Sequence, residues 1–223
     1  MNTKDPRSRY VFRCFWCVLL WACCVVGGTP EVHAENWSVR NRARRHKIVL
    51  RRFQKLVERN PNRGFAFKRM VKLARRHPGL DRLIVSYRKK SKRAPRKINY
   101  RLILAHLLQL TRQKGAALLA YQQVIKRKPN HRLAHFYLAS LFRSLARYDE
   151  ALKHYEKALS LAKKTAFRRR CLKALGTLSL LNKKPKKALR YWRTFLALSP
   201  RNTSARGEIA RSLARHKLYD ESI

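Results

Sequence analysis

Two histidines stand four residues apart, a spacing that places both side chains on one helix face and that metal sites often use. They are His131 and His135. However, His131 follows Pro129 and Asn130, a pair typical of a turn. His135 occupies the place of a core residue in the helical pattern around it. We therefore expect neither a metal site nor a cofactor.

Acidic residues are too few and too scattered for acid–base catalysis. The 223-residue chain has 11 Asp and Glu, and none of them pair at a suggestive spacing. The sequence contains no Gly-rich phosphate loop, and no Ser–His–Asp arrangement stands out. Of the five cysteines, only Cys171 lies outside the N-terminal 34 residues, among leucines that predict a buried thiol. The sequence thus predicts a protein that is not an enzyme.

Positive charge dominates the composition. Lys and Arg total 55, which gives a formal net charge of +44. Basic clusters occur at 40–47, 88–97, 163–170 and 183–187. Such a surface binds polyanions by releasing their counter-ions, so nucleic acid, acidic glycan or lipid headgroups are candidate partners. A solvated basic face without a ligand is the alternative.

The first 34 residues have the pattern of an export signal. A basic start precedes an apolar run over 14–26, which is followed by small residues and a V-H-A triplet ending at Ala34. The run is shorter than the roughly 20 residues that span a bilayer as a helix. We expect a signal peptide cut near Ala34 and an exported protein, periplasmic or secreted. The alternative is an uncleaved membrane anchor through residues 14–26.

An internal repeat is the strongest pattern in the rest of the chain. Pro61, Pro95 and Pro129 recur every 34 residues. Aromatic residues keep step with them at spacings of 34, 34, 34 and 37: Phe53, Tyr87, Tyr121, Tyr155 and Trp192. Each proline lies eight residues after an aromatic one, and Pro200 lies eight after Trp192. A fixed period of this length is typical of stacked repeat units.

Each repeat unit is predicted to be a pair of antiparallel helices. Apolar residues recur at three- and four-residue steps over 133–145 and again over 149–161. A short connection over 146–148 separates these two segments, and Asp149 can cap the second. The second helix of each unit is expected to stop before its proline, because proline disfavours helical geometry in the residue ahead of it.

The stretch YDEALKHYEKALSL over 148–161 resembles the second helix of a tetratricopeptide repeat, with Ala151, Tyr155 and Ala158 in series. Leu175-Gly176 and the closing Pro200 also match that family's pattern. The resemblance covers about residues 47–223. It implies an all-α fold, a right-handed α-solenoid of stacked antiparallel helix pairs.

The expected organisation is a signal peptide or anchor over 1–34 and a repeat array over 35–223. The array would contain a helix over 47–60, repeats over about 64–97, 98–131, 132–168 and 169–202, and a partial repeat over 203–223.

The resemblance also implies a concave groove lined by the first helix of each pair, which in this family receives a partner peptide or helix. Carried over by alignment, the groove residues are Phe65, Lys68, Lys72, Arg75, Arg76, Leu102, His106, Phe136, Arg143, Arg170 and Lys173. A groove with basic ends and an apolar middle suits an acidic or amphipathic partner. We expect a protein-binding scaffold, with polyanion binding through the basic surface as the alternative.

Overall fold

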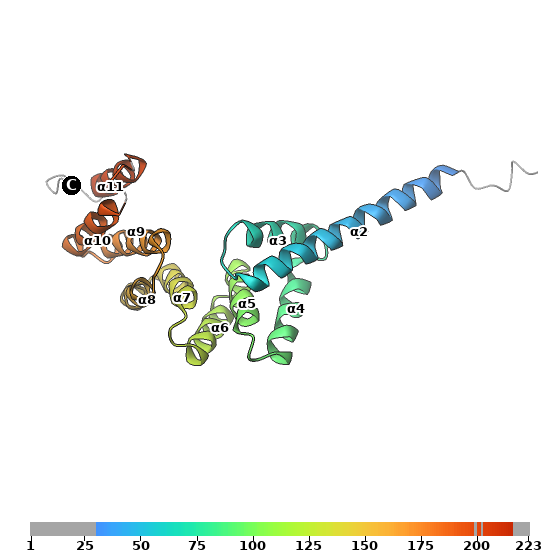
Figure 1. Ribbon diagram of the computed structural model, residues 1–223, viewed down its shortest axis with the longest axis horizontal. Coiled ribbons are helices and arrows are strands. Elements are labelled where there is room, and N and C mark those ends of the chain that lie inside the picture. The colour runs from blue at the N-terminus through green and yellow to red at the C-terminus, as the bar shows by residue number, and fades with distance from the viewer. Residues whose placement is uncertain (1–29, 199, 202, 216–223) are drawn as a thin grey trace, which may run out of the picture. The chain divides into compact units, whose positions relative to one another are not determined.

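The computed structural model describes residues 30–198, 200–201 and 203–215, and these residues form α-helices and no strand (Figure 1). The predicted all-α solenoid is confirmed. Residues 1–29 of the expected signal segment, including the apolar run over 14–26, lie outside the described residues, as does the end of the predicted partial repeat. The last five residues of that segment, 30–34, belong to the first described helix. Among the helices that are described, none is long and apolar enough to cross a membrane.

The chain divides into two units, residues 1–51 and 52–223. The first described helix, α2, spans Pro30–Arg59 and so begins well before the predicted start at residue 47. Its length has a simple cause, since no glycine or proline occurs between Pro30 and Pro61. Proline is tolerated in the first turn of a helix and breaks one further along.

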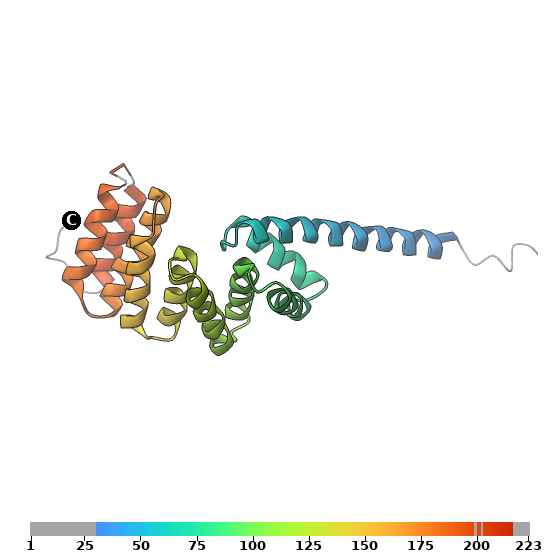
Figure 2. The ribbon, with the colours of Figure 1, turned by 60° about the horizontal axis from the view of Figure 1, so that its bottom comes forward.

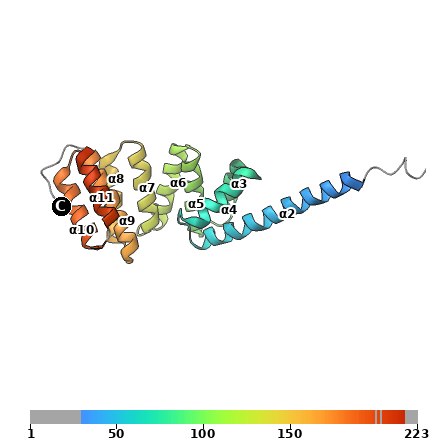
Figure 3. The same ribbon diagram turned by 90° about the horizontal axis from the view of Figure 1, so that it is seen from above.

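The helices that follow alternate with short connections. They are α3 (Phe65–Arg76), α4 (Leu80–Arg93), α5 (Ile98–Leu110), α6 (Lys114–Arg127), α7 (Arg132–Ser144), α8 (Tyr148–Ser160), α9 (Thr165–Leu181), α10 (Pro185–Ala197) and α11 (Thr203–Arg215). Each of them packs against the next in sequence from α3 to α11. Figure 3 shows α5 to α8 as successive neighbours, and Figure 2 shows the orange and red helices α9 to α11 side by side.

The turn inside the helix pair recurs in three units. Arg112, Ala146 and Lys183 have φ angles of 60°, 57° and 54°, in the left-handed region. In each turn the next amide donates to the carbonyl five residues earlier, as from Gln113 to Leu108 at 2.9 Å. This geometry satisfies carbonyl groups at the end of the first helix. The shared turn gives the pairs a common internal arrangement.

One buried ring closes each helix pair. Tyr87, Tyr121, Tyr155 and Trp192 are all at most 2% exposed, so the aromatic period of the sequence marks core positions. Each ring meets the first helix of its own pair. Tyr121 lies beside His106 at a ring distance of 5.6 Å, and Tyr155 beside Phe136 at 5.2 Å.

Trp192 fits because its neighbour has no side chain. A Cβ atom placed on Gly176 would lie 2.0 Å from Nε1 of Trp192, closer than any real contact. The indole therefore lies directly on the backbone of α9. Leu172, Leu189 and Ile209 belong to the same core cluster, which joins α9, α10 and α11.

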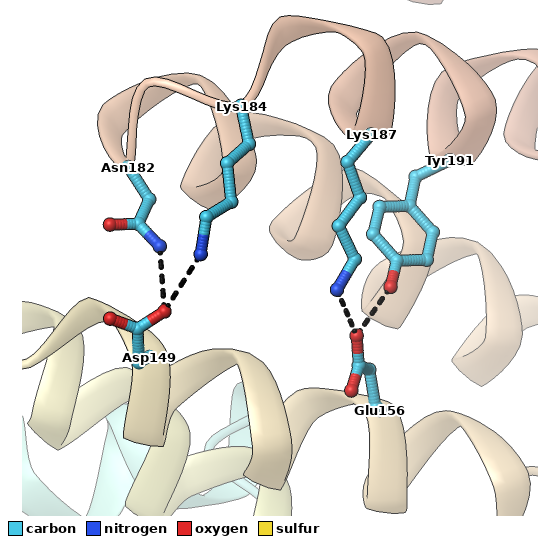
Figure 4. A network of polar contacts seen from close by, with 6 residues as sticks. All are labelled: Asp149, Glu156, Asn182, Lys184, Lys187 and Tyr191. Atoms are coloured by element: carbon cyan, nitrogen blue, oxygen red, sulfur yellow. Dashed lines mark hydrogen bonds and ion pairs between the residues drawn. The ribbon is translucent and has the colours of Figure 1, made fainter.

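Carboxylates link α8 to the following helix pair (Figure 4). The Asp149 carboxylate accepts hydrogen bonds from Asn182 at 3.0 Å and from Lys184 at 2.9 Å. Glu156, two turns further along α8, accepts from the Tyr191 hydroxyl at 2.6 Å and pairs with Lys187 at 2.9 Å. The bonds from Lys184 and Asn182 hold the pKa of Asp149 below its ordinary value. Such exposed pairs stabilise little individually but fix the contact geometry.

A buried histidine ties the loop before α3 to later helices. Nε2 of His106 lies 3.0 Å from the Pro61 carbonyl oxygen, which can only accept, so Nε2 carries the ring proton. Nδ1 is then an acceptor, and the Tyr121 hydroxyl lies 2.6 Å from it and donates. The rings of Phe67 and Tyr137 pack on this imidazole at 5.7 and 4.4 Å. His106 therefore organises α3, α5, α6 and α7 around one neutral imidazole.

Replacing Gly176 by alanine should destabilise the fold by about 1–3 kcal/mol, because the new methyl group would force Trp192 out of its site. Urea unfolding followed by circular dichroism measures this change. The matched control is Gly115→Ala in α6, where a Cβ meets nothing within 4 Å. The control should be stabilised by about 0.5–1 kcal/mol through helix propensity. Equal stabilities of the two variants would contradict the close packing.

Acidification should destabilise the fold through His106. Burial lowers the pKa of this imidazole to about 3 from the ordinary 6.5. The unfolded chain therefore binds an extra proton between these pH values, and the free energy of unfolding falls as the pH drops through this window. The loss from this one group is roughly 1 kcal/mol per pH unit. Urea unfolding at several pH values below about 7 measures the slope.

The comparison that isolates this effect is His106→Gln. Between about pH 3 and 6.5 this variant should take up one proton fewer on unfolding than the wild type does. Its free energy of unfolding should therefore change less steeply with pH. A wild type and a variant with the same slope would show that His106 titrates normally in the fold.

Candidate functional site

A cleft of about 510 Å³ lies along α3 and the end of α5. Basic side chains and apolar ones share its lining: Arg63, Phe67, Lys68, Val71, Lys72, Arg75 and Leu110. Lys68, Lys72 and Arg75 follow one another at steps of four and three residues, so they share one face of α3. Among the described residues, no carboxylate lines this cleft.

The floor of this cleft is apolar and held by the core. Phe67 and Val71 are 3% and 7% exposed, and Leu110 is half-buried. Phe67 and Val71 are four residues apart and lie beside the basic row on α3. An amphipathic helix of this kind buries one side and leaves ammonium and guanidinium groups at the rim.

Arg63 is fixed at the edge of the cleft before any ligand arrives. Its guanidinium donates to Oε1 of Gln109 at 3.1 Å and lies 5.7 Å above the ring of Tyr137. Its backbone amide donates to the Tyr137 hydroxyl at 2.8 Å. The His106 network described above holds the loop that carries it. Arg63 thus presents a charge with little side-chain freedom left to lose.

The structure brings together three of the predicted groove residues, namely Lys68, Lys72 and Arg75. Phe65 and Arg76 are also exposed on α3, where Phe65 is 73% accessible, but neither lines the cleft.

Two predicted groove residues are corrected. Leu102 and His106 are both 0% exposed, so no partner can reach them in this fold. The reason lies in α5, where every residue from Leu102 to Leu108 is buried. A helix packed on all sides has no groove face, and the family alignment assigned one to it.

The remaining predicted residues lie on later helices, away from this cleft. The Arg170 guanidinium covers the half-buried ring of Phe136 at 4.8 Å. Arg143 is exposed at the end of α7. Lys173 forms an ion pair with Glu208 of α11 and lines a separate cavity of about 30 Å³. The structure therefore does not gather all the predicted residues into one site.

Arg63, Phe67, Val71 and Leu110 were missed by the sequence analysis. Phe67 and Val71 could have been found, because they lie close to predicted cations on the same helix. Arg63 could not, since its position depends on partners 46 and 74 residues away in sequence.

The histidines considered for metal binding have structural partners. Nδ1 of His131 accepts from the Ala134 amide at 3.1 Å and caps α7. Nε2 of His135 donates to the Pro129 carbonyl at 2.7 Å, and its Nδ1 lies 2.9 Å from Nδ1 of His154. Within the described chain, no group of three His, Cys, Asp or Glu residues could hold a metal ion. Cys171 is buried, and burial raises its thiol pKa to about 12.

Comparisons with known proteins agree with this architecture. The sequence model described as tetratricopeptide repeat matches residues 100–166, from α5 to the start of α9. A search by sequence among curated proteins finds no match.

Solved structures share the fold at low sequence identity. TTC0263, a thermophilic TPR protein of Thermus thermophilus, is 18% identical, with 82% of this chain and 96% of that chain covered and a TM-score of 0.55. MamA of Desulfovibrio magneticus RS-1 is 16% identical, with coverages of 79% and 98% and a TM-score of 0.52. YrrB, described as a TPR protein with an unusual peptide-binding site, is 23% identical, with coverages of 60% and 68% and a TM-score of 0.50.

Residues 100–166 therefore carry a tetratricopeptide repeat sequence, and the described chain has the α-solenoid fold of tetratricopeptide proteins.

Proposed function

We propose that this protein is a non-enzymatic scaffold that binds an acidic, amphipathic segment of a partner protein in the cleft along α3. The observation that carries the proposal is the composition of that cleft. Four cations, Arg63, Lys68, Lys72 and Arg75, surround a floor of Phe67, Val71 and Leu110. A segment with carboxylates on one side and apolar side chains on the other complements both features.

The apolar floor favours a peptide over a simple polyanion at this site. Phe67 and Val71 are already almost fully buried, so a partner gains apolar contact mainly from Leu110 and the methylene stems of Lys68 and Lys72. This gain is roughly 25 cal/mol per Å² at any salt concentration. The basic rim would add attraction that salt screens. A partner that uses both would remain bound at salt concentrations that release a ligand held by charge alone.

The fixed position of Arg63 supports the same conclusion. Lys68, Lys72 and Arg75 project from one helix, and Arg63 is already held by Gln109 and Tyr137. The guanidinium of Arg63 therefore loses little conformational entropy when a ligand binds, whereas the exposed Lys68, Lys72 and Arg75 side chains become ordered only in the complex. YrrB, of the same fold, has a peptide-binding site, which makes peptide recognition a reasonable function for the fold.

The lining of the cleft also suits binding better than catalysis. Its charged groups among the described residues are all cations, and no carboxylate or histidine stands among them to exchange a proton with a substrate. We therefore assign the site to recognition.

Export remains part of this proposal. If residues 1–34 are a cleaved signal, the protein produced in a secreting bacterium should begin at Glu35. The intact mass of the purified protein measures this directly. A membrane-bound protein of full mass would instead support an anchor through residues 14–26.

The triple variant Lys68→Glu, Lys72→Glu, Arg75→Glu should bind peptide more weakly than the wild type. Peptides selected from a display library against the wild type should carry both carboxylates and apolar side chains. They should stay bound at about 0.5 M salt, where charges are screened within about 4 Å. Three exposed contacts of roughly 0.5 kcal/mol each predict about a tenfold weaker binding to the variant, measurable by fluorescence anisotropy.

The control is a triple reversal of equal charge on α10, Lys186→Glu, Arg190→Glu, Arg193→Glu, because these exposed residues line no cleft described here. It should leave peptide binding unchanged. The proposal fails if the selected peptides are purely acidic and are released by salt, or if they bind the α3 variant as tightly as the wild type.

A further inference from the structure

Two further clefts lie at the ends of the helix pairs, and their linings together contain more cations than the lining of the α3 cleft. The first has a volume of about 570 Å³, and its lining contains five cations: Lys55, Arg59, Arg96, Lys97 and Lys128. The second, of about 420 Å³, shares Lys128 and adds Arg132 and Lys163. His131 lines both clefts. We call these seven cations the basic strip.

The basic strip is separate from the cleft on α3. It lies where α5 and α7 begin, whereas Leu110 of the α3 cleft is the last residue of α5. The length of α5 from Ile98 to Leu110 corresponds to about 18 Å along a helix. The two linings share no residue, and they come nearest in sequence at Arg59 of the strip and Arg63 of the α3 cleft.

The charge of the basic strip is not neutralised within its lining. Among the described residues, Glu58 is the one carboxylate there, and it already pairs with Lys90 at 2.6 Å and accepts from Tyr87 at 3.2 Å. Four of the other carboxylates described between residues 52 and 215 form ion pairs outside the strip, namely Asp149, Glu150, Glu156 and Glu208. Asp81 lies in the first turn of α4.

The placement of these cations opposes helix stability. Lys97 is the N-cap of α5, Arg132 is the first residue of α7, and neither helix has an acidic residue in its first turn. A cation at a helix N-terminus faces the positive end of the helix dipole, at a cost of about 0.3–1 kcal/mol. In contrast, α8 begins with Asp149 and Glu150, the favourable arrangement. Lys114 of α6, Lys164 before α9 and Lys184 before α10 are placed in the same way, so a cation at a helix start does not by itself mark a site. At α5 and α7 the cations also line the two clefts.

Two groups near the strip have lowered pKa values, and burial is the larger cause for both. Burial, and then the charge of Lys128, lower the pKa of His131. Since Nδ1 of His131 caps α7, the proton of the neutral ring is on Nε2. The cleft thus also offers a neutral N–H donor. Burial followed by repulsion from Arg127 lowers the pKa of Arg101 nearby on α5.

We propose that the basic strip binds the phosphodiester backbone of a single-stranded nucleic acid without reading its bases. A linear polymer suits two clefts that share Lys128 and His131. Guanidinium groups match phosphate oxygens in pairs, and helix N-termini favour phosphate. Pockets of this volume hold small molecules, so they fit a single strand better than a duplex. The proposal is independent of the peptide site.

The lining explains why bases would not be read. Tyr100 is the aromatic side chain there, but its ring is half-buried, with the ammonium groups of Lys90 and Lys97 at 5.7 and 5.8 Å. Base stacking, which strengthens many single-strand sites, is therefore weak.

The test uses a fluorescently labelled oligothymidylate long enough to cross both clefts, with the full chain and the variant Lys97→Glu, Arg132→Glu, Lys163→Glu. Each lost phosphate contact weakens binding about fivefold near 0.1 M salt, so the variant should bind on the order of 100-fold more weakly. The slope of log affinity against log salt should fall by about 2. Glu at helix starts favours helix formation, so unfolding would not mimic this loss.

The α10 triple reversal is the matched control, because it changes the net charge by the same amount. It should retain most of the oligonucleotide binding and the full slope of log affinity against log salt. Two competitors at equal charge, heparin and polyglutamate, test whether the strip prefers phosphodiester groups to sulfate or carboxylate groups. The proposal is overturned if the α10 control weakens binding as much as the strip variant. It is also overturned if either competitor binds the wild type more tightly than the oligonucleotide does. Retained binding by the strip variant would equally refute it.

Discussion

The ring that closes each helix pair is the contact on which the array depends. Two helices of this length cannot bury an apolar face alone, and the ring of the second helix fills the space against the first. Tyr121 does so on His106, Tyr155 on Phe136 and Trp192 on Gly176. The partner differs each time while the ring position stays fixed. Large and small residues therefore compensate one another within a pair.

This contact explains why so much of the fold could be predicted. A periodic ring in a periodic apolar pattern indicates both the helices and their pairing, and the all-α solenoid followed from it. The cleft residues on α3 could be predicted in part, because Lys68, Lys72 and Arg75 lie on one exposed helix face. Leu102 and His106 were wrong because α5 is buried all round, although its continuous apolar run LILAHLL over 102–108 was visible in the sequence.

The rest of the site depends on contacts between distant segments. Arg63 follows a proline in a short loop, and nothing local predicts its direction. The basic strip likewise appears only when α2, the loop over 94–97 and the start of α7 come together. Charge clusters in the sequence indicated a basic protein. They did not show that the few carboxylates are used for contacts between helices, which leaves the cations of the strip unneutralised.

The support of Arg63 by Tyr137 has a consequence for dividing this protein into fragments. All described residues that line the α3 cleft precede residue 111, so the loop before α3 and the first two helix pairs contain the whole lining. Yet the hydroxyl that orients the Arg63 backbone belongs to α7, in the third pair. A fragment that ends at the repeat boundary before α7 would keep every lining side chain but would lose the Tyr137 contact that orients Arg63. The smallest piece with an intact recognition surface is thus larger than the surface itself.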